Sequence, residues 1–261
     1  MNDTVLLFET VGPVARLTLN RPRAMNALNL AMLAELDRCL DQIATSAELR
    51  VVILTGAGEA FCAGADLKEV LAGQQLAAGE PDFLDRAGLV FDKLRALPKP
   101  VIAALNGVTM AGGLELAMCA DLIVASEQTR IGDAHANYGV YPGGGGAAIL
   151  PRLVPLNIAL YLLYTGRTLS AAEMKTHGLV CEVHPQAQLA DAVLALAQEI
   201  ATKSPIALSR MKQVARASAD KTRDEALLHE QVMLRQHLRS FDIQEGLRAF
   251  AEKRAPRFQG R

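Results

Sequence analysis

The chain has 261 residues, of which 51% are hydrophobic and 21% are charged, and its formal net charge is −1. This composition is typical of a folded globular protein and argues against a disordered or collagen-like chain. The near-zero charge offers no general attraction for nucleic acid or for an anionic membrane surface. A negatively charged ligand must therefore be held by local groups.

Cysteines and histidines are scattered along the chain, without a CxxC pair and without metal-ligand spacing, so no metal centre is expected. We interpret Cys39, Cys62, Cys119 and Cys181 as reduced thiols in the core of a cytoplasmic protein. The first residues lack the basic and apolar segments of a signal peptide. Polar residues interrupt the longest apolar stretch, at 101–125, so a membrane span is not expected.

Strand and helix patterns alternate through the first half of the chain. Short apolar runs bounded by glycine predict strands, and apolar residues three and four apart predict helices. In chain order, these patterns predict strands at 5–8 and 14–20, a helix at 28–44, a strand at 50–55, a loop at 58–64, a helix from Asp66, a strand at 99–105, a helix after Gly112-Gly113 and a strand at 121–125. Such alternation favours an α/β core with crossover connections.

A glycine loop at 141–146, which reads YPGGGG, lies just past the middle of the chain. Helical patterns follow from Ala147 and at 157–164, and the last quarter of the chain is helical without a strand signal. We therefore expect two regions. The first, at 1–195, is an α/β core that holds the active site, and the second, at 196–261, is helical.

Two junctions between a predicted strand and a predicted helix carry small residues where the helix begins: FCAGADLKE at 61–69 and NGVTMAGGLELA at 106–117. The first N–H groups of a helix lack internal partners, and the helix dipole makes that end positive. Two such ends that face one point would hold a developing oxyanion. Glu115 lies one turn inside the second helix. Either junction alone is more often a turn or packing device, and their combination favours a site.

These two segments resemble the signature loops of the crotonase superfamily, the enoyl-CoA hydratase/isomerase family. Further segments match the family in order along nearly the whole chain: RPRAMNAL at 21–28, PGGGG at 142–146, TGRTLSAAE to GLV at 165–180, and EGLRAFAEKR at 245–254. The resemblance implies an α/β spiral of ββα units with a C-terminal helical region that forms a homo-trimer or hexamer. It also implies an acyl-CoA thioester substrate and no cofactor, since coenzyme A enters with the substrate.

The resemblance also implies roles for individual residues. The backbone N–H groups of Ala65 and Gly112 match the oxyanion hole, and Glu115 matches the first catalytic glutamate of the hydratases. The positions that match substrate and CoA binding are Arg23, Ala24, Ala63, Ala65, Asp66, Leu67, Lys68, Gly112, Phe250 and Lys253. In the family, the last helix often reaches the CoA of a neighbouring subunit.

One position departs from the two-glutamate hydratases. Counted back from Pro142, the place of the second glutamate is occupied by His135. Histidine titrates near neutral pH, so Glu115 and His135 could share the proton transfers of a hydration. Alternatively, His135 only forms a hydrogen bond to nearby backbone. Asp133 and Tyr138 are secondary candidates for polar contacts.

We therefore expect an enoyl-CoA hydratase, and three alternatives stay open: a hydrolase of a thioester or C–C bond, an acyl-CoA isomerase, and a non-catalytic acyl-CoA-binding protein. Glu115 at the expected position disfavours the non-catalytic protein, and the missing second acid disfavours the isomerase. The acyl group is expected to meet residues from 70–95 and 133–145. Four apolar residues in the first of these ranges would suit a hydrophobic acyl chain, although core packing explains them equally well. They are Leu71, Leu76, Phe83 and Leu84.

Overall fold

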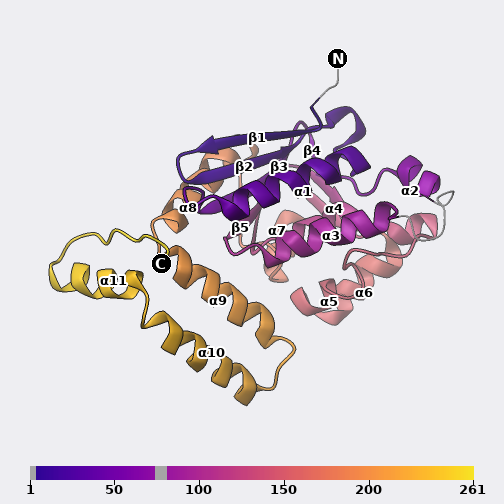
Figure 1. The fold of residues 1–261 in the computed structure, drawn as a ribbon. Coiled ribbons are helices and arrows are strands. Elements are labelled where there is room, and N and C mark those ends of the chain that lie inside the picture. Colours follow the sequence, from indigo (N-terminus) through magenta and orange to yellow (C-terminus); the bar gives the residue numbers. More distant parts are fainter. Residues whose placement is uncertain (1–3, 74–80) are drawn as a thin grey trace.

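The computed structural model describes residues 4–73 and 81–261 and contains two sheets (Figure 1). The larger sheet has six strands, in the order β1 (Leu6–Val11), β2 (Val14–Leu19), β3 (Val51–Gly56), β5 (Val101–Leu105), β7 (Leu122–Ser126) and β10 (Glu182–His184). The smaller sheet has four, in the order β4 (Ala60–Cys62), β6 (Val108–Met110), β8 (Arg130–Gly132) and β9 (Thr168–Ser170). The first and last pairs, β1–β2 and β8–β9, are antiparallel, and the other pairs are parallel.

From β3 to β8, consecutive strands alternate between the two sheets. The pairs β3–β4, β5–β6 and β7–β8 each give one strand to the larger sheet and the next to the smaller sheet. This repeated step produces the expected spiral. The prediction of a loop at 58–64 was wrong for Ala60–Cys62, and β6 was not predicted either. Three-residue strands are too short to show a hydrophobic period.

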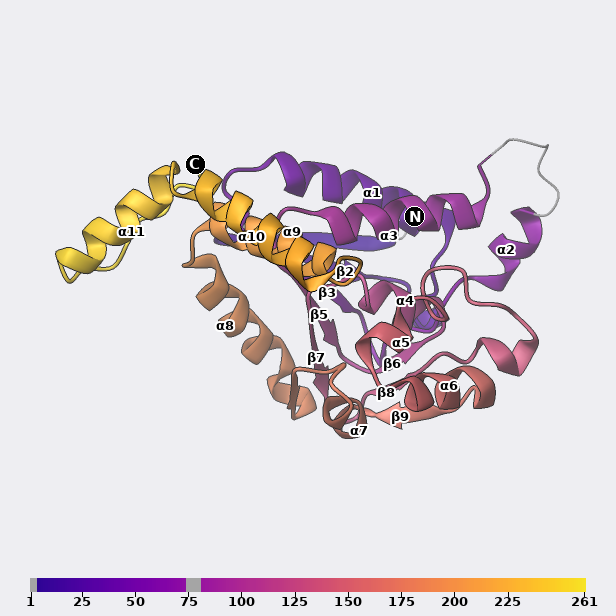
Figure 2. The ribbon, with the colours of Figure 1, turned by 90° about the horizontal axis from the view of Figure 1, so that it is seen from below.

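Helices cover both faces of the larger sheet, as Figure 2 shows. α1 (Leu30–Thr45) and α3 (Phe83–Ala96) lie on one side, and α8 (Leu189–Ala201) lies on the other. Successive side chains of β3 pack on opposite faces of the larger sheet, because side chains along a strand point alternately to its two sides. Val52 and Leu54 join the larger core with α1, whereas Val51 and Ile53 join the core beneath α8.

The remaining elements up to α8 are short. They are the helices α2 (Leu67–Gly73), α4 (Gly112–Ala117), α5 (Leu150–Leu153), α6 (Leu156–Thr165) and α7 (Ala171–Thr176), and the 3₁₀ turns η1 (Pro22–Ala24), η2 (His135–Tyr138) and η3 (Gln186–Gln188). The helix predicted from residue 28 begins at Leu30, because the Asn29 side chain caps it by accepting the Met32 N–H at 3.0 Å. Leu28 therefore lies outside the helix, and its backbone pairs with Ala65.

Three helices follow the core: α9 (Pro205–Ser218), α10 (Arg223–His237) and α11 (Phe241–Ala251). α9 and α10 pack together, and α11 lies across the molecule from α2 in both views (Figures 1 and 2). α8 spans the expected boundary at residue 195 and packs on the larger sheet. No helix in the described ranges is long and apolar enough to cross a membrane.

The thiols differ in their surroundings. Cys39, Cys62 and Cys119 are buried, and burial raises the pKa of both Cys62 and Cys119 to about 12. Cys181 is exposed, so its assignment to the core was wrong. Its backbone N–H donates to the Ile123 carbonyl at 2.8 Å, and its side chain faces outward beside the edge strand β10.

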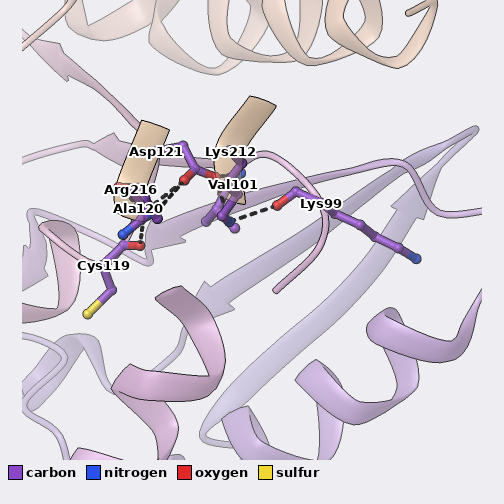
Figure 3. Close-up of polar contacts among 7 residues, drawn as sticks. All are labelled: Lys99, Val101, Cys119, Ala120, Asp121, Lys212 and Arg216. Atoms are coloured by element: carbon purple, nitrogen blue, oxygen red, sulfur yellow. Dashed lines mark hydrogen bonds and ion pairs between the residues drawn. The ribbon is translucent and has the colours of Figure 1, made fainter. Parts of the chain in front are cut away.

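A polar cluster fastens α9 to the core (Figure 3). Asp121, which precedes β7, pairs with Lys212 at 2.8 Å and with Arg216 at 2.7 Å. Lys212 also donates to the Lys99 carbonyl at 3.1 Å, and its side chain is 11% exposed. Burial lowers the pKa of Lys212, although the charge of Asp121 opposes that effect. The cluster therefore depends on the Asp121 carboxylate to balance a largely buried ammonium group.

We expect Asp121→Ala to lower the free energy of unfolding by about 3 kcal/mol, because it leaves a buried charge without its partner. The matched control is Asp220→Ala, which breaks the Arg152–Asp220 pair, whose side chains are 59% and 69% exposed. An exposed pair contributes about 1 kcal/mol or less. Urea unfolding measures both variants, and equal stabilities would contradict this role for Asp121.

Candidate active site

Three neighbouring strands of the smaller sheet direct the candidate residues to one edge. β4, β6 and β8 are parallel, so their carboxyl ends lie together. The chain carries Ala65 after β4, Gly112 and Glu115 after β6, and Asp133 and His135 after β8. Parallel sheets commonly bind ligands at this edge. The topology therefore brings together residues that lie up to 70 positions apart in the sequence.

Ala65 is held by a single strand-like contact with Leu28. The Leu28 N–H donates to the Gly64 carbonyl at 2.8 Å, and the Asp66 N–H donates to the Leu28 carbonyl at 2.7 Å. In a parallel bridge of this kind, the N–H of the middle residue points away from the partner. The Ala65 nitrogen lies beside Gly112, where a side chain would place its Cβ 3.3 Å from that nitrogen.

The Gly112 N–H lies at the start of α4. Ala111, which precedes it, has a φ of 49°, a backbone conformation that is strained for a residue with a side chain and is often found at functional sites. In the described part of the chain, neither the Gly112 N–H nor the Ala65 N–H donates to a protein acceptor. In this part of the chain, two backbone donors thus remain available close to each other.

Glu115 lies beneath the glycine loop and is 4% exposed. Its Oε1 accepts the N–H groups of Gly144 at 2.7 Å and Gly146 at 2.9 Å. Hydrogen bonds to a charged acceptor are short and strong, so they fix the carboxylate in place. A Cβ at Gly144 would lie 2.8 Å from Glu115 Oε2, so this loop requires glycine for its close approach.

Arg95, near the end of α3, supports the glycine loop from the other side. Its Nη2 donates to the Gly144 carbonyl at 2.6 Å, and its Nη1 donates to Asp92 at 3.0 Å. The guanidinium lies 5.9 Å from the centre of the Phe91 ring, within cation–π range. This role could not be predicted from the sequence, because α3 was not predicted and the loop is 49 residues away.

His135 begins η2, and its side chain is 12% exposed. Its ring Nδ1 lies 2.9 Å from Asp133 Oδ1, so the ring contacts a carboxylate and not the backbone. Burial lowers the pKa of His135, but the hydrogen bond and charge of Asp133 and the charge of Glu115 outweigh burial. The pKa of His135 is therefore raised above its ordinary value, which favours the imidazolium form.

Four of the residues expected on the CoA side come from two segments that contact each other, η1 and the loop after β4. Arg23 and Ala24 are exposed in η1. The Asp66 carboxylate is engaged by Arg21, whose Nη2 lies 2.9 Å from Oδ2. Ala63 donates its N–H to the Met25 carbonyl at 3.0 Å. Arg21, which was not predicted, ties the segment before η1 to the start of α2.

Leu67 and Lys68 are exposed in the first turn of α2. Phe250 is 85% exposed on α11, and Lys253 follows that helix, so neither reaches the site of its own chain. Tyr138 is 78% exposed at the end of η2.

Apolar residues considered for the acyl chain fall into different environments. Phe83 is buried in the core, whereas Leu71 and Leu84 are exposed. A Leu84 methyl lies 3.8 Å from the Cβ position of Gly143, beside the glycine loop. Leu76 lies outside the described residues. Leu84 is thus the apolar candidate that the structure places nearest the site.

Free N–H groups beside a buried, fixed carboxylate are typical of enzymes that stabilise an oxyanion. The chain belongs to the enoyl-CoA hydratase/isomerase family, whose model matches residues 9–261. It is 38% identical to a 2,3-dehydroadipyl-CoA hydratase of Escherichia coli, over 95% of this chain and 96% of that protein. It is 36% identical to a short-chain-enoyl-CoA hydratase of Clostridium acetobutylicum, over 97% and 96%.

The fold is shared with solved structures of the same family. A crystal structure of an enoyl-CoA hydratase from Bacillus anthracis superposes with a TM-score of 0.92 and 37% identity, over 98% of this chain and 100% of that one. The expected α/β fold with C-terminal helices is therefore confirmed. Among the described residues, no group of three or more side chains could hold a metal ion.

Proposed function

We propose that the protein is an enoyl-CoA hydratase that adds water across the double bond of a 2-enoyl-CoA thioester. The observation that carries this proposal is one edge that combines two N–H donors without a protein partner among the described residues, a buried carboxylate and a histidine with a raised pKa. Hydration needs these parts: an oxyanion hole, a base for water and an acid for carbon. The hydratases among the relatives support the same reaction.

In the proposed reaction, the thioester oxygen accepts hydrogen bonds from the Ala65 and Gly112 N–H groups. Glu115 takes a proton from water while the oxygen of that water bonds to the β-carbon. The electron pair of the double bond moves into the enolate, whose charge the two N–H groups stabilise. The His135 imidazolium then gives one proton to the α-carbon, and solvent carries the proton of Glu115 back to His135.

This scheme needs no cofactor, because the only charged intermediate is an enolate that the backbone holds. Coenzyme A enters with the substrate and would lie along Arg23, Ala24 and Lys68. Phe250 and Lys253 would reach the coenzyme A of a neighbouring copy, since α11 is remote from its own site. The proposed assembly is therefore a cytoplasmic homo-trimer or hexamer. In it, residues 1–195 form the catalytic core and 196–261 the helical region.

The pH dependence of the rate tests the role of His135. Because the acid must be protonated, kcat/KM should fall as the pH rises through the His135 pKa, which lies above its ordinary value of 6.5. His135→Ala should remove this limb and lower kcat by about 100-fold, with little change in acyl-CoA affinity. The matched control is His229→Ala, on α10. An unchanged profile in the His135→Ala variant would refute this assignment.

The raised pKa of His135 also makes the free energy of unfolding depend on pH. A raised pKa in the folded state means that protonation of His135 favours folding. This contribution is fully present below the pKa of the unfolded chain and is lost as the pH rises through the folded value.

A further inference from the structure

Asp133 lies directly after β8 and is 1% exposed. The next residue, Ala134, has a φ of 61°, which turns the chain back on itself. The turn lets one oxygen of Asp133, Oδ1, accept both the backbone N–H of His135 at 3.3 Å and its ring Nδ1 at 2.9 Å. A short local turn thus holds both the backbone and the ring of His135 against one carboxylate oxygen.

The other oxygen, Oδ2, is buried and has no hydrogen-bond partner among the described residues. A Cβ at Gly146 would lie 2.5 Å from this oxygen and 3.4 Å from Glu115 Oε1. The Asp133 and Glu115 carboxylates therefore approach the glycine loop at the same residue. A buried polar atom without a partner is unfavourable, and few such atoms occur in a folded protein.

We propose that Asp133 is a positioning residue for the hydration, a role that rests on the function proposed above. Asp133 holds the proton on His135 Nδ1, so that Nε2 is the nitrogen that gives a proton to the substrate. A carboxylate that accepts from one ring nitrogen fixes the tautomer and orientation of the ring. It also stabilises the imidazolium form through charge. Among the described residues, Nε2 has no hydrogen-bond partner.

A purely structural role would need only the hydrogen bonds of the turn. Asp133→Asn separates the two roles, because asparagine keeps an oxygen for the His135 N–H and ring but carries no charge. Of the two carboxylates that raise the pKa of His135, only Glu115 then remains charged. We expect the NMR titration midpoint of the His135 ring to move to lower pH by about one unit or more. The descending limb of kcat/KM should move with it.

At pH 8, we expect kcat of the Asp133→Asn variant to fall by about tenfold or more, because a downward shift of one pH unit lowers the imidazolium fraction about tenfold. KM should change little, since Asp133 contacts His135 and not the proposed CoA path. The matched control is Glu182→Gln. It removes the charge from a similar contact, in which Glu182 lies 2.9 Å from His184 Nε2 on β10, and it should leave kcat and its pH profile unchanged.

The tautomer is measured on the unaltered protein by ¹⁵N NMR of His135 above its titration midpoint. A proton on Nδ1 is expected, and a proton on Nε2 would overturn the proposal. An unmoved His135 midpoint in Asp133→Asn, or a moved midpoint with unchanged kcat, would also overturn it. A different result would show that the proposed hydratase function is wrong: the unaltered protein would add no water to enoyl-CoA esters, whatever the His135 titration shows.

Discussion

Gly112→Ala is expected to lower kcat by about 100- to 1000-fold, the usual loss when an oxyanion donor is removed. The added methyl would lie 3.3 Å from the Ala65 nitrogen and 3.5 Å from the carbonyl carbon of Gly64. It would therefore occupy the place where the enolate oxygen must approach the Ala65 N–H. The oxygen would keep at most one of its two donors.

The matched control for this substitution is Gly88→Ala on α3, where an added Cβ meets no atom within 4 Å. Alanine also has the better helix propensity, so this variant should be at least as stable as the unaltered protein. Steady-state kinetics with an enoyl-CoA, together with thermal unfolding, compares the two. A folded Gly112→Ala protein with activity within a few-fold of the control would rule out an oxyanion hole at Ala65 and Gly112.

Glu115→Gln is expected to lower kcat by at least about 100-fold, because glutamine cannot take a proton from water. Glutamine keeps the Oε1 acceptor, so the Gly144 and Gly146 N–H groups retain their partner and the glycine loop should stay in place. KM should change little, since Glu115 contacts no residue of the proposed CoA path. The loss would therefore appear in the chemical step.

Glu9→Gln serves as the control for Glu115→Gln. Glu9 is exposed on β1, and its carboxylate makes only a long ion pair with Arg16, at 3.9 Å. Binding of a non-reactive acyl-CoA, measured by calorimetry, checks that the Glu115→Gln site is intact. Near-full activity in the Glu115→Gln variant would exclude Glu115 as the base.

Sequence patterns predicted the longer elements because these bury a continuous face. The helix expected at 28–44 occurs at Leu30–Thr45, and the strand expected at 50–55 occurs at Val51–Gly56. The strands of the smaller sheet were not predicted, because each has three residues and lacks a readable period. That sheet nevertheless brings β4, β6 and β8 side by side, and so creates the site.

The candidate residues Ala65, Gly112, Glu115 and His135 could be found from small residues at two helix starts and from the family resemblance. Their supports could not be found in this way. Arg95 reaches Gly144 over 49 residues, and Leu28 orders Ala65 through backbone atoms that carry no sequence signal. Asp133 was only a secondary candidate for polar contacts, since a structural role explained it equally well. Its importance depends on burial, which only the fold determines.

The most direct test of the proposed hydration is the fate of crotonyl-CoA in water enriched in both ¹⁸O and deuterium, followed by mass spectrometry of the products. The proposed reaction predicts a 3-hydroxyacyl-CoA with one ¹⁸O on carbon 3 and one deuterium on carbon 2, because Glu115 activates solvent water and His135 delivers a solvent proton. Release of free coenzyme A, or a shifted double bond without solvent oxygen, would contradict it.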